Sequence, residues 1–327
     1  MRLPGAALSA LLTFTVAQAA DSPAAWLDRM SRAVEHLSYK GQLVHVNETD
    51  TSVLSIVHRS RNGEVAERIT SVDMGREIIR TNDEVIFILP DKRTVLVEAR
   101  DDRNRNQSPL RANLPGAIKP DRRLYGVAFD GVESIAGRRA QIVAIRPLDP
   151  YRYGYRISID RQTGMPLKTQ LLDEDGRALE QIFFSAIRFQ ASIADKDVQP
   201  SVKLGTLTML RFAPAGGQAE NQPAESWGSA DLPPGFRMTS SQAKLGANLP
   251  AGLQQVVYSD GLATVSVFIE PAVAASEQAE GLSRIGAANA YSTTANGIMV
   301  TAIGEVPAQT VEKLARSARS APAPSAR

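Results

Sequence analysis

The 327-residue chain contains no cysteine, which excludes disulfide bonds and any chemistry that depends on a thiol. Histidine is also scarce: only His36, His45 and His58 occur, and no acidic residue or thiol accompanies them at the spacing of a metal site. The motifs of phosphate-binding loops, dinucleotide folds, nucleophile elbows and zinc proteases are missing as well. We therefore expect no cofactor, no bound metal and no catalytic centre, and a structural role for the three histidines.

Neither sign of charge dominates the sequence. There are 37 Lys and Arg residues against 35 Asp and Glu residues, a formal net charge of +2. This balance argues against a nucleic-acid partner, which would favour a strongly basic surface. After the first twenty residues, no apolar run approaches the roughly 20 residues that a helix needs to cross a bilayer.

The first twenty residues have the pattern of a secretory signal peptide. Arg2 supplies the positive start, residues 6–16 are apolar, and Ala17-Gln18-Ala19 matches a cleavage site. The apolar stretch is too short for a transmembrane helix, and no cysteine follows to carry a lipid anchor. We therefore expect the mature protein to be exported. Export without disulfides suits a mature chain of about 307 residues, which can bury an ample core.

The next segment predicts one helix followed by many short strands. Ser22-Pro23 is a typical helix start, and Trp26 and Met30 lie on the apolar face of the helix that follows. From Gly41 the hydrophobic period changes to two, and turn signals such as Asn62-Gly63 separate the strands. The expected strands are 41–46, 53–59, 64–72, 76–80, 85–89, 94–98, 127–132 and 141–146.

Residues 151–184 predict a three-stranded antiparallel meander. Strands are expected at 153–159, 166–172 and 180–184, with turns at Asp160 to Gly164 and at 173–176, and a further strand is expected at 187–193. Roughly ten antiparallel strands form a sheet that tends to curl, so that one face can wrap a helix or an apolar ligand. Tyr151, Tyr153 and Tyr155 would share one face, either as a packing ladder or as the border of such a cavity.

Changes in composition divide the chain into parts. The expected parts are a signal peptide at 1–20, a large domain at 21–212, a linker at 213–225, a small C-terminal domain at 226–320 and a disordered tail at 321–327. In the small domain we expect strands at 236–238, 253–258, 263–269, 287–293 and 297–303 and a helix at 308–318. Leu204 to Phe212 is expected to form an edge strand of the large domain.

Five stretches together closely resemble the MucB/RseB family of bacterial periplasmic regulators. They are the meander YRYGYRISIDRQTGMPLKTQLLDEDGRALEQIFF (151–184), AGRRAQIVAIRPLDPYRYGY (136–155), LPPGF (232–236), YSDGLATVSVFIEP (258–271) and GEVPAQTVEKLARS (304–317). They follow the family's order and cover most of the mature chain. The resemblance implies an α+β fold: a large unclosed β-barrel, similar to the periplasmic lipoprotein carriers and covered by helix, followed by a smaller α+β domain.

The resemblance also implies a negative regulator of an extracytoplasmic-function sigma factor. Such proteins bind the periplasmic domain of a single-pass anti-sigma factor and protect it from regulated proteolysis, and lipopolysaccharide or a lipid-like ligand releases them. A periplasmic lipid or lipoprotein carrier is the alternative, which explains the large domain but gives the small domain no role. A hydrolase with an unfamiliar motif is a third, weaker hypothesis. A homo-oligomer is left open.

Candidate site residues follow from this resemblance and from strand alternation. For the partner, the small-domain segment YSDGLATVSVFIEP (258–271) offers Tyr258, Val265, Val267, Phe268 and Glu270, although alternating valines more often face a core. For a lipid cavity, the candidate lining is Leu43, Ile56, Ile78, Phe87, Tyr153 and Ile157. Between Lys92 and Arg123, nine basic residues face four acidic ones, which indicates either a solvated rim or an anion-binding rim. The rim candidates are Arg100, Arg103 and Arg105. A register error of one residue would invert the cavity prediction.

Overall fold

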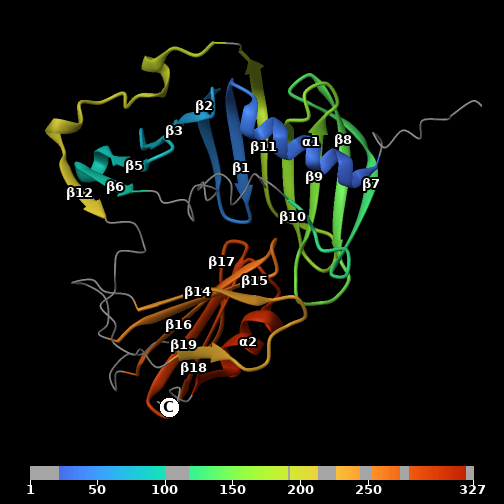
Figure 1. Cartoon of the computed structure of the whole chain (residues 1–327), viewed down its shortest axis with the longest axis vertical. Helices are drawn as coiled ribbons and strands as arrows, with labels where there is room; N and C mark the ends of the chain where they lie inside the picture. The colour runs from blue at the N-terminus through green and yellow to red at the C-terminus, as the bar shows by residue number, and fades with distance from the viewer. Residues whose placement is uncertain are drawn as a thin grey trace, which may run out of the picture.

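A computed structural model describes residues 22–99, 118–190, 192–212, 226–243, 252–272 and 280–321. These residues form a large sheet domain and a smaller α+β domain (Figure 1). The predicted signal peptide, the predicted linker at 213–225 and all but the first residue of the predicted tail lie outside the described residues. No helix in the described part of the chain has the length and apolar character needed to cross a membrane.

The first helix, α1 (Pro23–His36), begins where the sequence predicts. The side chain of Ser22 accepts a hydrogen bond from the backbone N–H of Ala25 at 3.1 Å, and Pro23 occupies the first turn, where its missing N–H costs nothing. The apolar face of α1 packs across the large sheet (Figure 1). Its buried residues are Trp26, Leu27, Met30, Ala33 and Val34.

The large domain is one 12-stranded sheet, which confirms the predicted wide, unclosed sheet. Its strands run in the order β12-β6-β5-β4-β3-β2-β1-β11-β10-β9-β8-β7, so that β12 and β7 are the edges. Among the strand pairs of the described residues, only β12–β6 is parallel. The bounds are β1 Tyr39–Asn47, β2 Thr51–Arg61, β3 Glu64–Ser71, β4 Glu77–Arg80, β5 Glu84–Leu89, β6 Thr94–Ala99, β7 Tyr125–Ile135, β8 Arg138–Pro147, β9 Gly154–Asp160, β10 Pro166–Leu172, β11 Ala178–Phe189 and β12 Thr208–Phe212.

One strand corrects the sequence prediction. The strand expected at 180–184 and the start of the strand expected at 187–193 form a single strand, β11, which ends at Phe189 and pairs with β1 from Glu180 to Phe189. Its register shifts because Gln42 pairs with Ala186 while Leu43 pairs with Phe184, which leaves Ser185 as a bulge. The extra residue breaks the alternation of apolar and polar side chains, and the sequence pattern therefore resembles two strands.

The two halves of the large sheet bury opposite faces. On the half nearest α1, residues such as Leu43, Ile157 and Phe184 pack beneath the helix. On the half made by β4, β5 and β6, the buried side chains point the other way and pack against Leu204 and Leu207. The chain from residue 192 to 212, with short helical turns η3 (Asp195–Val198) and η4 (Leu204–Thr206), supplies this second cover.

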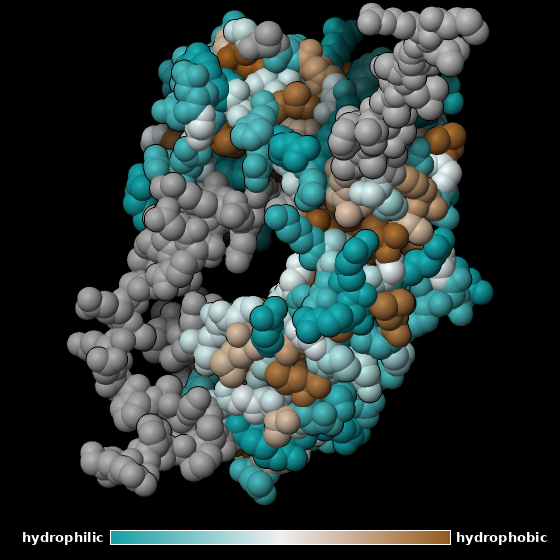
Figure 2. Space-filling view, turned by 45° about the vertical axis from the view of Figure 1, so that its right-hand side comes forward, coloured by the Kyte–Doolittle hydropathy of each residue, from teal (hydrophilic) through white to brown (hydrophobic). Residues whose placement is uncertain are grey.

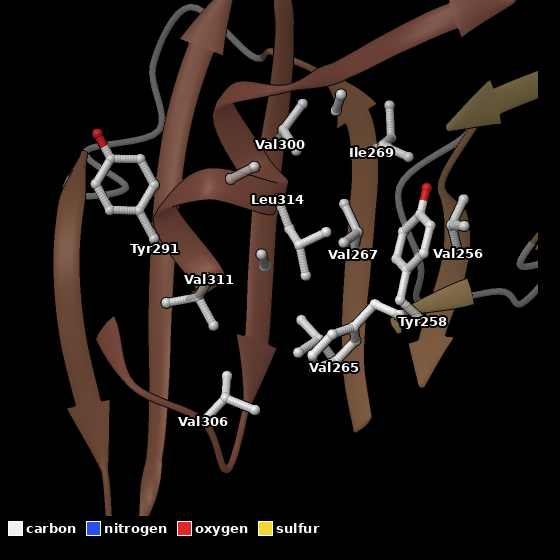
Figure 3. Close-up of a cluster of buried hydrophobic side chains, with 14 of the residues drawn as sticks. Val256, Tyr258, Val265, Val267, Ile269, Tyr291, Val300, Val306, Val311 and Leu314 are labelled. Atoms are coloured by element: carbon white, nitrogen blue, oxygen red, sulfur yellow. The ribbon is translucent and has the colours of Figure 1, made fainter. Parts of the chain in front are cut away.

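The small domain is a six-stranded antiparallel sheet with one helix on one face. Its order is β14-β15-β16-β19-β18-β17, and a two-stranded ribbon pairs β13 with β20. Figure 3 shows Val311 and Leu314 of the helix facing valines of the sheet, which together form a buried core. The bounds are β13 Ser226–Ser229, β14 Arg237–Ala243, β15 Gln254–Ser259, β16 Thr264–Pro271, β17 Gly281–Ile285, β18 Ala288–Ala295, β19 Ile298–Gly304, α2 Ala308–Arg316 and β20 Ala318–Ala321. The sequence did not predict β13, β17 or β20.

Candidate functional site

The two domains meet at a polar seam, which we define as the contact between residues 147–155 of the large domain and the small domain. These residues connect β8 to β9 at the end of the large sheet. Arg152 lies at their centre and is only 1% exposed. A buried guanidinium is costly unless carboxylates and other acceptors surround it.

Carboxylates from both domains hold Arg152. Its Nε and Nη2 donate to the two carboxylate oxygens of Asp149, each at 2.9 Å. Nη1 donates to Asp260 of the small domain, and Nη2 also donates to the backbone carbonyl of Pro234 at 2.6 Å. Tyr125 donates its hydroxyl to the same Asp260 at 2.8 Å. Burial works to lower the pKa of Arg152, but the bond to Asp149 and the charge of Asp260 outweigh it and raise that pKa.

Aromatic rings and a tight turn close the space around this guanidinium. It lies 5.4 Å from the ring centre of Tyr125 and 5.3 Å from that of Phe236, within the range of cation–π attraction. Phe236 follows Gly235, which has a φ of 79°. A Cβ at Gly235 would come within 2.3 Å of Leu124 Cδ1, so glycine is required both for the turn and for the close approach of the large domain.

The start of α2 forms the second part of the seam. Gln309 donates its side-chain amide to the carbonyl of Pro150, and Thr310 donates its hydroxyl to the carbonyl of Tyr151, both at 2.8 Å. The ammonium of Lys313 lies 5.9 Å from the ring centre of Tyr151. These contacts fix the link between β8 and β9 against the helix.

Asn289 makes a third connection between the domains. Its side-chain amide donates both to the hydroxyl of Tyr153, at 2.9 Å, and to the carbonyl of Val306, at 2.7 Å. Burial raises the pKa of Tyr153, so its hydroxyl stays protonated. Four of the stretches singled out in the sequence therefore converge here: LDPYRYGY, LPPGF, the YSDG turn and GEVPAQT.

Sequence reasoning did not predict this convergence. Asp260 lies in the hairpin turn between the expected strands 253–258 and 263–269, where one of its carboxylate oxygens accepts from the backbone N–H groups of Leu262 and Ala263 at 2.8 and 2.7 Å. Its second carboxylate oxygen accepts hydrogen bonds from Tyr125 and Arg152 of the large domain. The only signal was an arginine between tyrosines at a strand junction, and hydrophobic periodicity does not detect a buried charge.

A second polar cluster lies where β1 and β11 approach the small domain. We call it the His–Glu–Glu cluster, and it consists of His45, Glu180 and Glu305. His45 Nε2 lies 2.6 Å from Glu180 Oε1. Glu305 lies between β19 and α2 and borders a small cavity shared with the large sheet. Burial, together with the charge of Glu180, raises the pKa of Glu305 to about 7. The hydrogen bond that His45 donates to Glu180 raises the pKa of His45.

His58 belongs to a third buried network, inside the large domain. Its Nδ1 lies 2.9 Å from Glu67 Oε2, and Arg80 donates to both Glu67 oxygens at 3.2 Å. Burial opposes ionisation of Glu67, but the charge of Arg80 and the bond to His58 lower its pKa to about 2. The ring of His58 stacks on Tyr39 at 5.2 Å. No group of three or more metal-ligating side chains occurs within the described ranges.

The predicted partner-binding residues lie on both faces of the small sheet. Tyr258, Val265 and Val267 are at most 1% exposed and form the core beneath α2. Phe268 and Glu270 point to the opposite face and are partly exposed. Only the latter two can meet a partner without opening the domain, so we retain them as the candidate contact residues.

The predicted lipid-cavity residues are also divided. Leu43, Ile56 and Ile157 are at most 1% exposed on the face that α1 covers. Ile78 pairs with Phe87 on that same face, and both are partly buried. Tyr153 lies apart from them, in the seam. The predicted rim residues Arg100, Arg103 and Arg105 lie outside the described residues.

An open groove of about 400 Å³ lies at the end of α1. Its position places it at the rim of the face that contains Leu43 and Ile56. Apolar Leu37 and Phe189 share its lining with polar side chains. The full lining is His36, Leu37, Ser38, Ser60, Phe189 and Gln190.

The fold and the seam define a class of protein: a two-domain α+β protein whose open sheet and small domain are joined by a buried, charged contact. Comparison with known sequences gives the family. Residues 22–202 match the MucB/RseB N-terminal domain and residues 221–319 match the MucB/RseB C-terminal domain. The chain belongs to the MucB/RseB family.

Relatives of known function match almost the whole chain. It is 31% identical over 317 residues to the sigma factor AlgU regulatory protein MucB of Pseudomonas aeruginosa, covering 95% of each chain. It is 26% identical over 315 residues to the sigma-E factor regulatory protein RseB of Escherichia coli K12, covering 94% of this chain and 93% of that one. A solved complex of P. aeruginosa MucA and MucB superposes with a TM-score of 0.71 at 29% identity, covering 91% of this chain and 98% of that chain. A second structure, MucB bound to periplasmic MucA, gives a TM-score of 0.69 at 28% identity, with 91% and 99% covered.

Proposed function

We propose that this chain is a periplasmic negative regulator of an extracytoplasmic-function sigma factor. It binds the periplasmic domain of a membrane anti-sigma factor and protects that domain from regulated proteolysis. The observation that carries the proposal is the match of both domains, in order, to a family whose member MucB has been solved bound to MucA. The chain acts by covering a segment of its partner and needs no reaction of its own.

The joined domains suit this role. The seam holds the small domain in one orientation, so that a partner segment meets a preformed surface and loses less entropy on binding. Figure 2 shows a hollow between the two domains beside their contact. We propose that the partner binds on this side of the small sheet, with Phe268 as the apolar anchor and Glu270 as a polar contact.

We further propose that a lipid-like signal releases the partner by binding to the large domain. The groove at the end of α1 combines apolar and polar lining, as an amphiphile requires, and leads towards the face that contains Leu43 and Ile56. Release then follows from linkage. A lipid that prefers the free protein must lower the affinity for the anti-sigma factor by the same factor by which the partner lowers the affinity for the lipid.

A protection assay tests the proposal. The purified chain is mixed with the periplasmic domain of the cognate anti-sigma factor and the protease that cleaves it. Cleavage should slow in proportion to occupancy and resume when lipopolysaccharide is added. Phe268→Ala should weaken protection by about tenfold, the usual effect of removing an aromatic anchor. Thr294→Ala, at an exposed hairpin end of the same domain, serves as the control and should protect like the wild type.

Two outcomes would contradict the proposal. Cleavage that proceeds at the same rate with and without the chain would exclude a protective role. Capture of acylated lipoproteins from membranes, with no single-pass partner recovered, would favour a lipid or lipoprotein carrier instead.

A further inference from the structure

The His–Glu–Glu cluster lies at the edge of the contact between the domains, away from the Arg152 cluster. His45 comes from β1 and Glu180 from β11 of the large sheet, whereas Glu305 comes from the small domain. His45 and Glu180 form a close pair at 2.6 Å. Among the described residues, no hydrogen-bond donor or cation is found paired with the carboxyl group of Glu305. The small domain thus presents an uncompensated carboxyl group to a site that already holds one.

The cavity that joins them is too small for a ligand. Its volume of about 20 Å³ admits no more than one water molecule. Thr169 borders it and is 5% exposed, and its hydroxyl finds no hydrogen-bond partner in the part of the chain that the structure describes. Besides Thr169 and the carboxyl groups of Glu180 and Glu305, the lining is apolar or amide apart from the phenol of Tyr155. The lining residues are Tyr155, Thr169, Leu171, Glu180, Gln181, Ile182 and Glu305.

The charges around Glu305 are mostly negative. Glu180 of β11 acts on it directly, and His45 of β1 is the one cation that opposes this effect. Asp50, in the turn after β1, acts on His45, and Tyr155 of β9 adds a buried hydroxyl whose pKa is raised by burial. Arg284 of the small domain is paired with Glu48 of the same turn at 3.4 Å. A second negative charge on Glu305 would therefore meet little compensation.

We propose that the His–Glu–Glu cluster is a proton-controlled joint between the two domains. While Glu305 carries a proton, its neutral carboxyl group can lie against Glu180 and the domains stay in contact at this edge. When that proton is lost, two carboxylates repel each other across a site with little water, and this edge of the contact opens while the Arg152 cluster holds the other part. The proposal concerns this chain alone and does not depend on the identity of any partner.

The direction of the pH dependence follows from the closed form, which binds the proton more tightly. The pKa of Glu305 is raised to about 7 from an ordinary value of 4.5, so closure is fully favoured below the ordinary value and weakens as the pH rises through about 7. The positive charge of His45 opposes the repulsion at Glu305, so the loss of this charge as the pH rises acts in the same direction. One linked proton changes the closure equilibrium by at most about tenfold per pH unit.

Distance measurements between two spin labels test the joint. The chain has no cysteine of its own, so R188C and T294C place one label on an exposed site of each domain. Between about pH 6 and about pH 8.5, the wild-type background should gain a population with a changed interdomain distance, with a midpoint near neutral pH. Glu305→Gln, which imitates the protonated group, should keep the acidic distribution at both values.

Two further variants make the outcome decisive. Glu180→Gln removes the second carboxylate, so that its pH response should shrink several-fold even if Glu305→Gln folds poorly. Glu312→Gln, on an exposed face of α2, is the matched control and should respond like the wild type. Identical distance distributions at both pH values in the wild-type background would overturn the proposal, as would a full pH response in Glu305→Gln.

Discussion

At the scale of single residues, the strongest constraint in the molecule is a buried charge that two domains share. Arg152 and Asp260 both have fully buried side chains, and the sequence places them 108 positions apart. Taking such a pair out of water costs several kcal/mol, and the remaining acceptors around Arg152 offset that cost. Each partner therefore stabilises the domain contact only while the other is present.

Asp260→Asn removes the charge of Asp260 but keeps its hydrogen bonds within the hairpin turn, so it tests the two roles separately. The asparagine oxygen can still accept from the N–H groups of Leu262 and Ala263, so the hairpin turn is preserved. Arg152 would then lose one of its two carboxylates in a buried site. We expect a loss of about 3–5 kcal/mol in the free energy of unfolding, measured by urea denaturation.

An exposed ion pair provides the comparison for this variant. Asp175 and Arg177 form a pair with side chains 71% and 79% exposed. Asp175→Asn should change the free energy of unfolding by less than about 1 kcal/mol, because water screens such pairs. Equal effects of the two substitutions would show that the seam does not depend on the charge of Asp260.

At the scale of elements, local signals predict strands and turns but not the pairing of distant strands. The meander follows the prediction closely because Asp160 and Gly164 define its first turn, with Gly164 at a φ of 83°. The single strand β11 was divided in the prediction because of the bulge at Ser185. The parallel pairing of β12 with β6 depends on the chain from 192 to 212 crossing the sheet, and no local pattern encodes that path.

The entry of the chain into the small domain depends on one glycine turn. Gly235→Ala combines two penalties, since φ is 79° and the new Cβ would lie 2.3 Å from Leu124 Cδ1, a side chain buried against α1 and β7. We expect a loss of about 2–4 kcal/mol in the free energy of unfolding, from the strained backbone and from overpacking together.

Gly137→Ala separates these two penalties. Gly137 has a φ of 74° in a hairpin turn, but a Cβ there would meet nothing within 4 Å. It should therefore lose only about 1 kcal/mol, the cost of the backbone conformation. A loss at Gly235 no larger than the loss at Gly137 would contradict the close approach of the domains at the LPPGF turn.

At the scale of the whole molecule, the candidate site was only partly accessible to sequence reasoning. The family and the curled sheet follow from motifs and periodicity. The meeting of four motifs at the seam does not, because each motif is locally explained by a turn or a strand, as the YSDG turn illustrates. Alternation also left the face of β16 undetermined, and the structure places Val265 and Val267 in the core and Phe268 on the other face.

The seam should make the two domains unfold together. Arg152 contacts Asp149, Asp260 and the carbonyl of Pro234 at once through its planar fork. Arg152→Lys keeps the positive charge, but a single ammonium group cannot reproduce those contacts in their fixed geometry. We expect the wild type to show one calorimetric unfolding transition and Arg152→Lys to show two, because each domain has its own core and the coupling between them is weakened.

An Arg→Lys exchange at an exposed site serves as the control for the effect of the buried guanidinium geometry. Arg146 pairs with Asp130 at 3.0 Å, with its own side chain 63% exposed. Because an exposed ammonium can replace the guanidinium in such a pair, Arg146→Lys should leave a single transition at nearly the same temperature. If Arg152→Lys also unfolded in one unshifted transition, the guanidinium could not be what couples the domains, and the orientation offered to a partner would have to be set by α2 and its contacts with Pro150 and Tyr151.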